Sequence, residues 1–474
     1  MKNRLLSAII ILFGLAGQAR AQVDIRTEAD LSGLTLATSN GSYYHSKFSK
    51  RPDVNLFVAN TEADAVQALR QGRADVYVSD EVMLTRSDLE RLGMKIAFRG
   101  EETFDVAFAL KKGNESLRVQ LNAFLAQAPL EEIIDHWVAG GPEAEEPAYE
   151  IDPDAPPLRC LCCINLSPVS YVGESGEWMG MDPDIMRRFA HYLGRPFEMK
   201  YQDLSSGMIA LQTGQADVVS SCLFVTEERK ISVDFSNPYY KCHPAYFVMD
   251  KENDGRPGLA ERLKINLLTE NRWKLITDGL LETLKITFFA ILLGTILGAG
   301  VCASRRSRRK WLRSLAGLYG DFINGIPTLV LLLIMFYVVF AKTGINATTV
   351  AIVTFALCFA SAAGSIFDTS IESVPKGQTE AGLALGFTPL RTFTGIVFPQ
   401  ALKSGLPLYA GECVSLLKNT SIVGYIAIQD ITRASDLIRS RTFDALIPLL
   451  VVTILYFVLA WLIRLLLNLF LKKK

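Results

Sequence analysis

Long apolar runs are confined to the second part of this 474-residue chain, and this uneven distribution is the feature that most limits its fold. Five apolar segments are each long enough to cross the roughly 30 Å hydrocarbon core of a bilayer. They lie at about 276–301, 316–340, 347–367, 403–428 and 445–470. Residues 23–260 have the charge density of a water-soluble protein. The sequence therefore predicts a soluble part followed by an all-α, five-span membrane domain.

The N-terminus resembles an export signal. Lys2 and Arg4 precede an apolar stretch, and Ala19 and Ala21 form a small-x-small cleavage pattern. We expect residues 1–21 to be a signal peptide. The alternative is an uncleaved membrane helix, although the apolar core is shorter than the ~20 residues that a bilayer requires.

Basic clusters predict the orientation of the membrane domain. Six of the ten residues in 304–313 are cationic, and the chain ends in three lysines at 472–474. Both clusters belong in the cytoplasm by the positive-inside rule. An odd number of spans then places the soluble part outside. We expect a bacterial plasma (inner) membrane protein with an extracytoplasmic soluble part and a cytoplasmic C-terminus.

Composition and motifs exclude several classes of function. Lys+Arg 49 equals Asp+Glu 49, which argues against a nucleic-acid binder. No P-loop motif occurs, the four histidines form no pattern, and no catalytic residue is expected. The exported cysteines at 160, 162 and 163 lack the second ligand pair of a zinc site, so we expect no metal. Five cysteines in the exported part leave at least one thiol free or paired with another chain.

The loop 368–400 holds the most specific motif. Glu380, Ala381 and Gly382 are followed after three residues by Gly386, and after nine more by 396–399, with the sequence Ile-Val-Phe-Pro. This spacing resembles the EAA loop of ABC importer permeases, with glycine in place of the second alanine. We expect a short helix at 378–385 that Gly386 ends as a cap, with Pro399 starting the next element. In that family this helix docks into the ATPase subunit.

Flanking motifs narrow the resemblance to the polar amino-acid permeases of the histidine and glutamine importers. The similar segments include 324–330, 373–378, 399–402 and 417–421, and the resemblance runs from about 272 to 468. It implies a type I ABC importer permease domain at 270–472, with the EAA loop in the cytoplasm. The family usually has an arginine at position 324 and charged residues at 365 and 368, so Asn324 and Ser365 in particular depart from its pattern.

Two ionisable residues lie within the fourth predicted span. Glu412 and Lys418 are six residues apart and cannot pair with good geometry on one helix. Charged groups inside a span are candidates for a translocation path. Alternatively, Glu412 lies near the cytoplasmic interface and extends toward water.

The soluble part alternates short strands and helices, which is typical of α/β domains. Residues 158–255 resemble the first lobe of polar amino-acid-binding proteins through G-x-x-x-G-x-D, A-L-x-x-G-x-x-D, T-x-E-R and F-S-x-P-Y-Y motifs. Residues 23–139 resemble the second lobe and tail of that family, and 140–157 reads as a linker. The reversed order predicts a circularly permuted two-lobed clamshell. The alternative is two incomplete half-domains.

An α-amino acid ligand needs a cation for its carboxylate and a carboxylate for its ammonium. The resemblance assigns Arg229, with Thr226 in the same motif, and the helix start at Ser42 and Tyr43 to the first role, and Asp80 to the second. Leu166, Cys222 and Phe224 stand where the family has aromatic, small and hydroxyl side chains. These changes predict a more apolar pocket, or weakened binding.

The combined expectation is an amino-acid importer subunit in which binding protein and permease are one chain. Its partners would be a pair of ATPase subunits, which carry the ATP and Mg²⁺, and a second permease copy in a homodimer or a homologous permease. This chain itself would need no cofactor. The alternatives are a ligand-gated channel, which would need a pore-filter motif and no EAA loop, and an amino-acid sensor that has lost transport.

Overall fold

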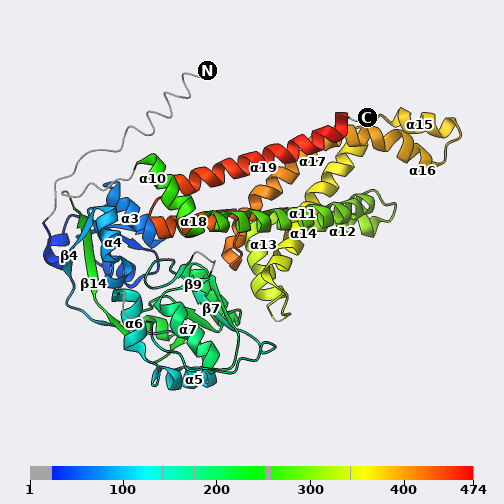
Figure 1. Cartoon of the computed structure of the whole chain (residues 1–474). Coiled ribbons are helices and arrows are strands. Elements are labelled where there is room, and N and C mark those ends of the chain that lie inside the picture. The colour runs from blue at the N-terminus through cyan, green and yellow to red at the C-terminus, as the bar shows by residue number, and fades with distance from the viewer. Residues whose placement is uncertain (1–23, 140–142, 174–176, 251–257, 342, 473–474) are drawn as a thin grey trace, which may run out of the picture. The chain divides into compact units, whose positions relative to one another are not determined.

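The computed structural model describes residues 24–139, 143–173, 177–250, 258–341 and 343–472, and the predicted signal peptide lies outside this part. The chain forms two compact units. One comprises Met1–Lys274 and Asp436–Pro448, and the other comprises Leu275–Ser435 and Leu449–Lys474. The first, which we call the binding domain, contains all the strands found among the described residues (Figure 1). The second, the helical unit, contains the apolar helices.

The binding domain has two lobes, each built on a five-stranded sheet. The first, here the Asp80 lobe, has the strand order β2-β1-β3-β14-β4, in which β1 pairs in parallel with β2 and β3 and β14 runs antiparallel to both neighbours. Helices α2, α3 and α4 belong to this lobe. The elements are β1 (Thr35–Ser39), α2 (Tyr43–Phe48), β2 (Asn55–Ala59), α3 (Glu62–Arg70), β3 (Val76–Asp80), α4 (Arg86–Leu92), β4 (Met94–Arg99) and β14 (Pro244–Met249).

The second lobe, here the Arg229 lobe, repeats this arrangement in the order β10-β7-β11-β6-β12. Strand β6 is again the antiparallel fourth strand. The elements are β6 (Ala109–Lys111), α5 (Glu115–Leu125), α6 (Leu130–Ala139), β7 (Leu158–Cys162), β8 (Tyr171–Val172), β9 (Trp178–Met179), α7 (Met181–Tyr192), β10 (Phe197–Tyr201), α8 (Leu204–Thr213), β11 (Val218–Ser220), α9 (Glu227–Lys230) and β12 (Val233–Phe235).

The lobes exchange strands, so the predicted boundary between them is displaced. Strand β6 and the helices α5 and α6, at 109–139, belong to the Arg229 lobe, whereas β14 returns to the Asp80 lobe. The two crossings lie side by side, because β5 (Phe104–Val106) pairs antiparallel with β13 (Tyr240–Cys242). This ribbon carries both connections between the lobes, and we refer to it as the hinge. Residues 143–157, in the predicted linker, contain no helix or strand.

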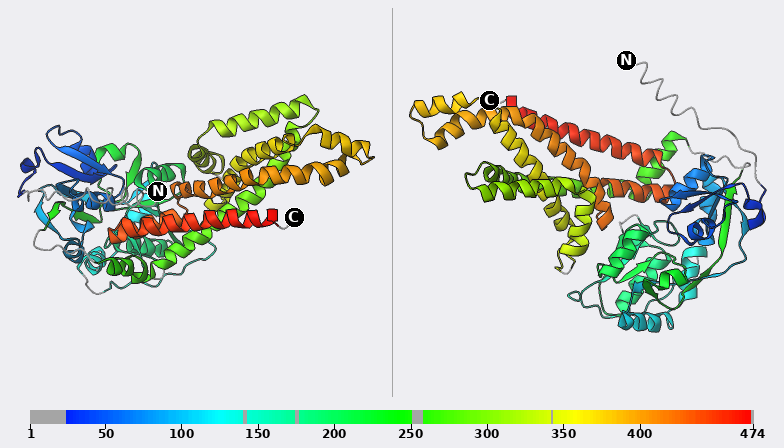
Figure 2. Two further views of the ribbon diagram at one scale, coloured as in Figure 1. Left: turned by 90° about the horizontal axis from the view of Figure 1, so that it is seen from above. Right: turned by 180° about the vertical axis from the view of Figure 1, so that it is seen from behind.

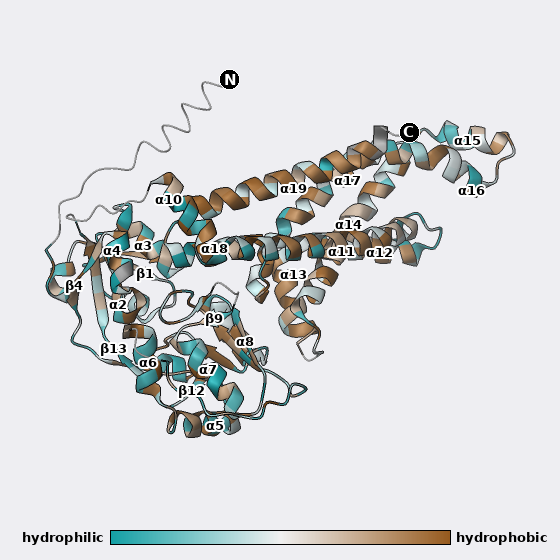
Figure 3. Cartoon of the chain, viewed as in Figure 1, coloured by the Kyte–Doolittle hydropathy of each residue, from teal (hydrophilic) through white to brown (hydrophobic). Residues whose placement is uncertain are grey.

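The helical unit consists of long apolar helices, which are largely brown in Figure 3. Three of them, α11 (Trp273–Arg305), α14 (Ala347–Glu372) and α19 (Leu446–Lys472), are long and apolar enough to cross a membrane. A fourth span results if α12 (Lys310–Gly325) and α13 (Thr328–Ile334), bent by 102° at their junction, count as one. Among the described residues the count is therefore three or four. The fourth predicted segment lies in α17 (Phe398–Asn419), which carries Pro407 and three charged residues and is not among the candidates.

Small residues allow α11 and α14 to approach closely. A Cβ on Gly294 would lie 2.8 Å from the carbonyl oxygen of Ala356, and one on Gly298 would lie 2.9 Å from Cβ of Ala363. Such contacts are common where membrane helices pack without a hydrophobic driving force between them.

Candidate ligand-binding and coupling sites

Asp80 ends strand β3 and is almost fully buried. The hydroxyl of Tyr44, on α2, donates a 2.7 Å hydrogen bond to its Oδ1. Burial raises the pKa of Asp80 to about 7, although the Tyr44 hydrogen bond and the charge of Arg229 oppose the shift. A buried carboxyl of this kind favours a cationic partner.

Arg229 lies in the short helix α9, three residues after its N-cap, and its side chain contacts the Asp80 lobe. Its Nη1 donates to the carbonyl oxygen of Phe224 and its Nη2 to that of Gly41, both at 3.1 Å. Burial lowers the pKa of Arg229, and Asp80 opposes this shift. The structure therefore brings together Arg229 and Asp80, which are 149 positions apart in the sequence and lie in different lobes.

Two other predicted residues serve as helix caps. The Thr226 side chain accepts from the backbone N–H of Arg229 at 3.3 Å. The Ser42 side chain accepts from the backbone N–H of His45 at 3.1 Å and shares a hydrogen bond with Thr38. These bonds stabilise the starts of α9 and α2. The hydrogen bond from Arg229 to the carbonyl oxygen of Gly41 lies beside both helix starts.

An aromatic cluster accompanies the charged pair. Phe224 stacks on Phe104 of the hinge strand β5 at a centroid distance of 4.5 Å, and Tyr43 lies 4.5 Å from the same ring. Tyr44 contacts Phe224 edge-on at 6.0 Å. Sequence reasoning included Tyr43 and Phe224 but missed Tyr44 and Phe104. The position of Tyr44 next to Tyr43 could have identified it as a site residue, whereas no motif in the sequence marks Phe104.

Cys222 and Leu166 lie in different surroundings. Cys222 is buried with φ of +48°, and its N–H donates to Asp182 at 3.1 Å. Burial raises the pKa of Asp182 to about 6. Leu166 is 3% exposed and belongs to a hydrophobic cluster with Ala37, Phe247 and Phe443 rather than to the aromatic cluster around Phe224.

The EAA-like loop folds as a helical hairpin of α15 (Lys376–Ala384), α16 (Pro389–Thr392) and the start of α17. Gly386 has φ of +80°, and the N–H of Phe387 donates to the carbonyl oxygen of Gly382 at 3.1 Å, which is the Schellman pattern. The prediction that Gly386 ends the helix is confirmed. The prediction that Pro399 starts the next element is wrong, because that element begins at Pro389, and α16 and the helical residues 393–397 run without a break into α17.

Gly382 is the buried residue of α15. A Cβ at this position would lie 2.6 Å from Cγ2 of Thr392, so the departure from the alanine of the motif accompanies close packing inside the hairpin. Glu380 and Ala381 are exposed. The hairpin also exposes Leu383, Leu385 (75%), Phe387 and Leu390. An exposed apolar patch of this kind is typical of a protein contact.

Glu412 and Lys418 lie on α17, as predicted. Glu412 is partly buried and Lys418 is exposed. Their role in a translocation path stays a prediction.

Comparisons with known proteins find a solute-binding family and transport permeases that are similar to this chain. The family of bacterial extracellular solute-binding proteins, family 3, matches residues 158–385, beginning at the first residue of β7. The L-cystine transport system permease protein TcyB of Bacillus subtilis (strain 168) is 29% identical over 202 residues, or 42% of this chain and 86% of that protein.

A second relative and one solved structure are also similar to parts of this chain. The probable amino-acid ABC transporter permease protein YckA of the same strain is 32% identical over 183 residues, which are 38% of this chain and 80% of that protein. A crystal structure of an amino acid ABC transporter with histidines is 30% identical and covers 46% of this chain and 100% of that chain, with a TM-score of 0.41.

Proposed function

Because this chain belongs to the permeases of amino-acid ABC transporters and carries a solute-binding domain, we propose that its two lobes capture an α-amino acid between Arg229 and Asp80. Import by this subunit then combines an extracytoplasmic receptor with a membrane permease. The channel and sensor alternatives are not favoured, since the relatives are named as permeases of transport systems.

The observation that carries the proposal is the convergence of Asp80 and Arg229 from opposite lobes. The buried carboxyl offers an anionic partner for the ligand's ammonium. The guanidinium, which has five N–H donors, can receive the carboxylate in a bidentate pair when its bonds to the carbonyl oxygens of Phe224 and Gly41 are exchanged.

The aromatic cluster supports an apolar ligand side chain. Phe224, Phe104 and Tyr43 pack together beside the charged pair, and none of them carries a charge that would pair with a charged ligand side chain. Transfer of an apolar side chain into such surroundings is favourable by about 1.5–3 kcal/mol when it is fully buried.

We also propose that the domain is circularly permuted. The solute-binding family match begins at β7, and residues 143–157 connect α6, which comes from the earlier stretch of the Arg229 lobe, to β7. Both ends of the domain then fall in the Asp80 lobe, before β1 and after β14.

The proposed membrane topology has five spans, with α12–α13 and α17 as the spans of weaker apolarity. Support comes from Figures 1 and 2, where the turn between α11 and α12, the α15–α16 hairpin and the last residues of α19 lie at the same end of the helical unit. This end would be cytoplasmic, as the basic residues require.

The hairpin at that end would dock the ATPase subunit through Glu380, Ala381 and its exposed leucines. ATP and Mg²⁺ would bind to that partner. One path needs two permease domains, so a second copy of this chain would complete it, with Glu412 and Lys418 near the path.

The test is a ligand screen on the full-length chain in nanodiscs. Thermal stabilisation is measured against the twenty amino acids, and a ligand at 100 times its Kd should add about 2.7 kcal/mol. Arg229→Ala and Asp80→Ala should both abolish the shift, while Arg86→Ala, which alters an exposed arginine of α4, should keep it. A folded domain that responds to no amino acid would contradict the proposal.

A further inference from the structure

Residues Asp436–Pro448, which we call the elbow segment, fold as part of the binding domain. They comprise the end of α18 (Ile431–Thr442) and the start of α19. The chain passes between the two units three times, after Lys274, Ser435 and Pro448. A simple fusion of two domains would need one passage.

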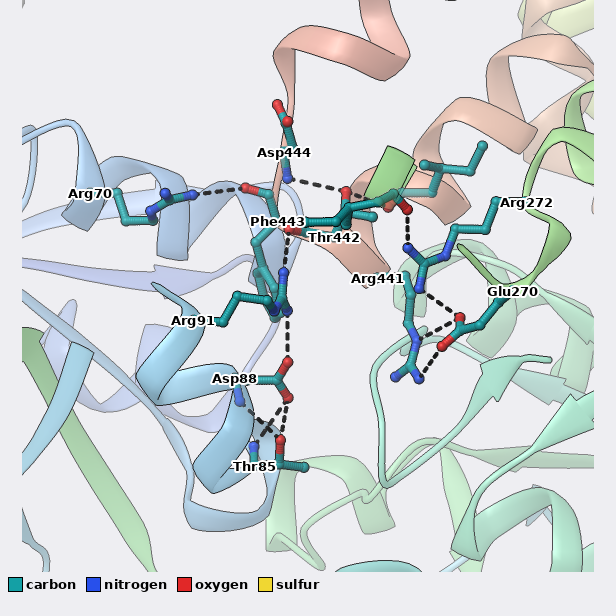
Figure 4. A network of polar contacts seen from close by, with 12 residues as sticks. Arg70, Thr85, Asp88, Arg91, Glu270, Arg272, Arg441, Thr442, Phe443 and Asp444 are labelled. Carbon is teal, nitrogen blue, oxygen red and sulfur yellow. Dashed lines mark hydrogen bonds and ion pairs between the residues drawn. The ribbon is translucent and has the colours of Figure 1, made fainter. Parts of the chain in front are cut away.

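Phe443 fixes the elbow segment to the Asp80 lobe. Its side chain is 1% exposed and belongs to a hydrophobic cluster with Val66, Tyr77, Leu92 and Phe247. Figure 4 shows the backbone around it approached by the side chains of α3 and α4.

The carbonyl oxygens of the elbow segment are held by three long side chains. The Phe443 oxygen accepts from Gln67 and, at 3.3 Å, from Arg70. The Thr442 oxygen accepts from Arg91 at 3.0 Å, and Arg91 is itself paired with Asp88 at 2.7 Å. Donors on charged groups make the stronger hydrogen bonds.

Residues 262–272, which precede α11, form side-chain contacts with the elbow segment. Arg262 forms a bidentate pair with Asp444 at 2.6 and 2.8 Å, and Asn266 bonds to Asp444 and Thr442. Glu270 lies between Arg272 at 2.6 Å and Arg441 at 3.3 Å (Figure 4).

The backbone also indicates a specified contact. Of the five non-glycine residues with positive φ in the described part of the chain, three lie here: Glu270, Asn271 and Phe443. Bulky residues adopt this conformation only where the surroundings require it.

Contacts with the Arg229 lobe are fewer. Asn165, which is buried, donates to the carbonyl oxygen of Leu437 at 2.7 Å. The guanidinium of Arg441 lies 4.0 Å from the ring centroid of Tyr171. Leu166 of this lobe also belongs to the hydrophobic cluster around Phe443, whereas the other buried members of that cluster come from the Asp80 lobe. The elbow segment therefore touches both lobes, and most of its buried contacts are with the Asp80 lobe.

We propose that the elbow segment is a permanent non-covalent anchor that holds the binding domain to its own permease by the Asp80 lobe throughout the transport cycle. The receptor then does not dissociate and redock on each turnover. Only the Arg229 lobe, with its lighter contacts, moves relative to the anchor.

The test separates the anchor from the covalent link. A protease site is introduced between Asp250 and Gly258 of the full-length chain, which carries a C-terminal tag. After cleavage in detergent, the fragment ending near residue 250 contains every strand of both lobes and no part of the elbow segment. We expect this fragment to remain with the tagged fragment through size-exclusion chromatography in 0.5 M NaCl.

Phe443→Ala should lower the retained fraction by about tenfold or more, since truncating a buried anchor removes most of a contact's strength. The matched control is Phe457→Ala, because Phe457 of α19 is 72% exposed. Reactivity of the buried cysteines 160, 162 and 222 with a thiol dye reports folding of the released fragment.

Three results would overturn the proposal. First, the cleaved wild-type fragment could separate from the tagged fragment and elute alone while still folded. Phe443→Ala could leave retention unchanged. The released variant fragment could be unfolded, which would make Phe443 a core residue and not an anchor. No amino acid is added, so the outcome is independent of ligand binding.

Discussion

Asp80 should make ligand affinity depend on pH near neutrality. Its carboxyl is buried, accepts from Tyr44 and has a pKa raised to about 7 by burial. Glu62 and Glu81 contribute in the same direction as burial, whereas Arg229 opposes it. Below this pKa the free domain holds a proton on Asp80, and the ligand's ammonium must displace it.

The magnitude follows from the titration. With a pKa of about 7, the charged form makes up roughly one tenth of the population at pH 6 and nine tenths at pH 8. The Kd for an amino acid should therefore fall about tenfold across this interval. Stability of the ligand-free domain should change in the opposite direction. A carboxyl whose pKa is raised on folding stabilises below its unfolded pKa, and this contribution is lost as pH rises through 7.

The assay is isothermal titration calorimetry of the full-length chain in nanodiscs from pH 5.5 to 8.5, with the amino acid identified in the screen. Tyr44→Phe removes a donor to the charged form and should move the midpoint above 7, and Asp80→Asn should bind weakly with a flat profile. Tyr246→Phe, which loses a 2.6 Å bond to Glu28, is the matched control and should leave the midpoint unchanged. An affinity that falls with rising pH, or a midpoint that Tyr44→Phe does not move, would refute the reasoning.

Three further predictions concern other parts of the chain. Phe443→Ala should destabilise the binding domain by about 3–5 kcal/mol, measured by thermal unfolding with a thiol dye, and a loss below ~1 kcal/mol would contradict its burial. Gly382→Ala should lower ATPase activity of the assembled transporter because the new Cβ meets Cγ2 of Thr392 and Cδ1 of Ile396. Adding Thr392→Ala and Ile396→Val together, which removes these atoms, should restore activity, and failure of this rescue would remove the steric explanation. Asn165→Ala should weaken amino-acid binding about fivefold, near 1 kcal/mol, if its bond to Leu437 forms only when the lobes close, and calorimetry showing an unchanged Kd would exclude that dependence.

Local patterns predicted the individual elements well. The expected alternation of short strands and helices is present in β1, α3 and β3, and the expected helix at 378–385 is α15 with Gly386 as its cap. Each depends on side chains within one or two turns. The exchange of β6 and β14 between lobes was not predicted, because a three- to six-residue apolar strand does not indicate which sheet it joins.

Site residues that belong to recognisable motifs were predicted from the sequence. Residues contributed by the hinge strand β5 and by the elbow segment were not. Arg229 and Asp80 came from motifs. Phe104 comes from β5, a short strand between the lobes, and Phe443 lies between the fourth and fifth predicted spans, where no structure was expected to contribute to the binding domain. Contacts across more than 350 residues, such as that of Arg91 with Thr442, leave no local pattern.

The order of elements and the position of the anchor support each other. The chain leaves the binding domain after β14, in the Asp80 lobe, and the elbow segment returns to the same lobe through Phe443. With the opposite lobe order, the exit would follow α6 in the Arg229 lobe, and covalent link and anchor would hold different lobes. Opening about the β5–β13 hinge would then strain one of them. In the observed order both hold the Asp80 lobe, and the Arg229 lobe remains free to move toward bound ligand.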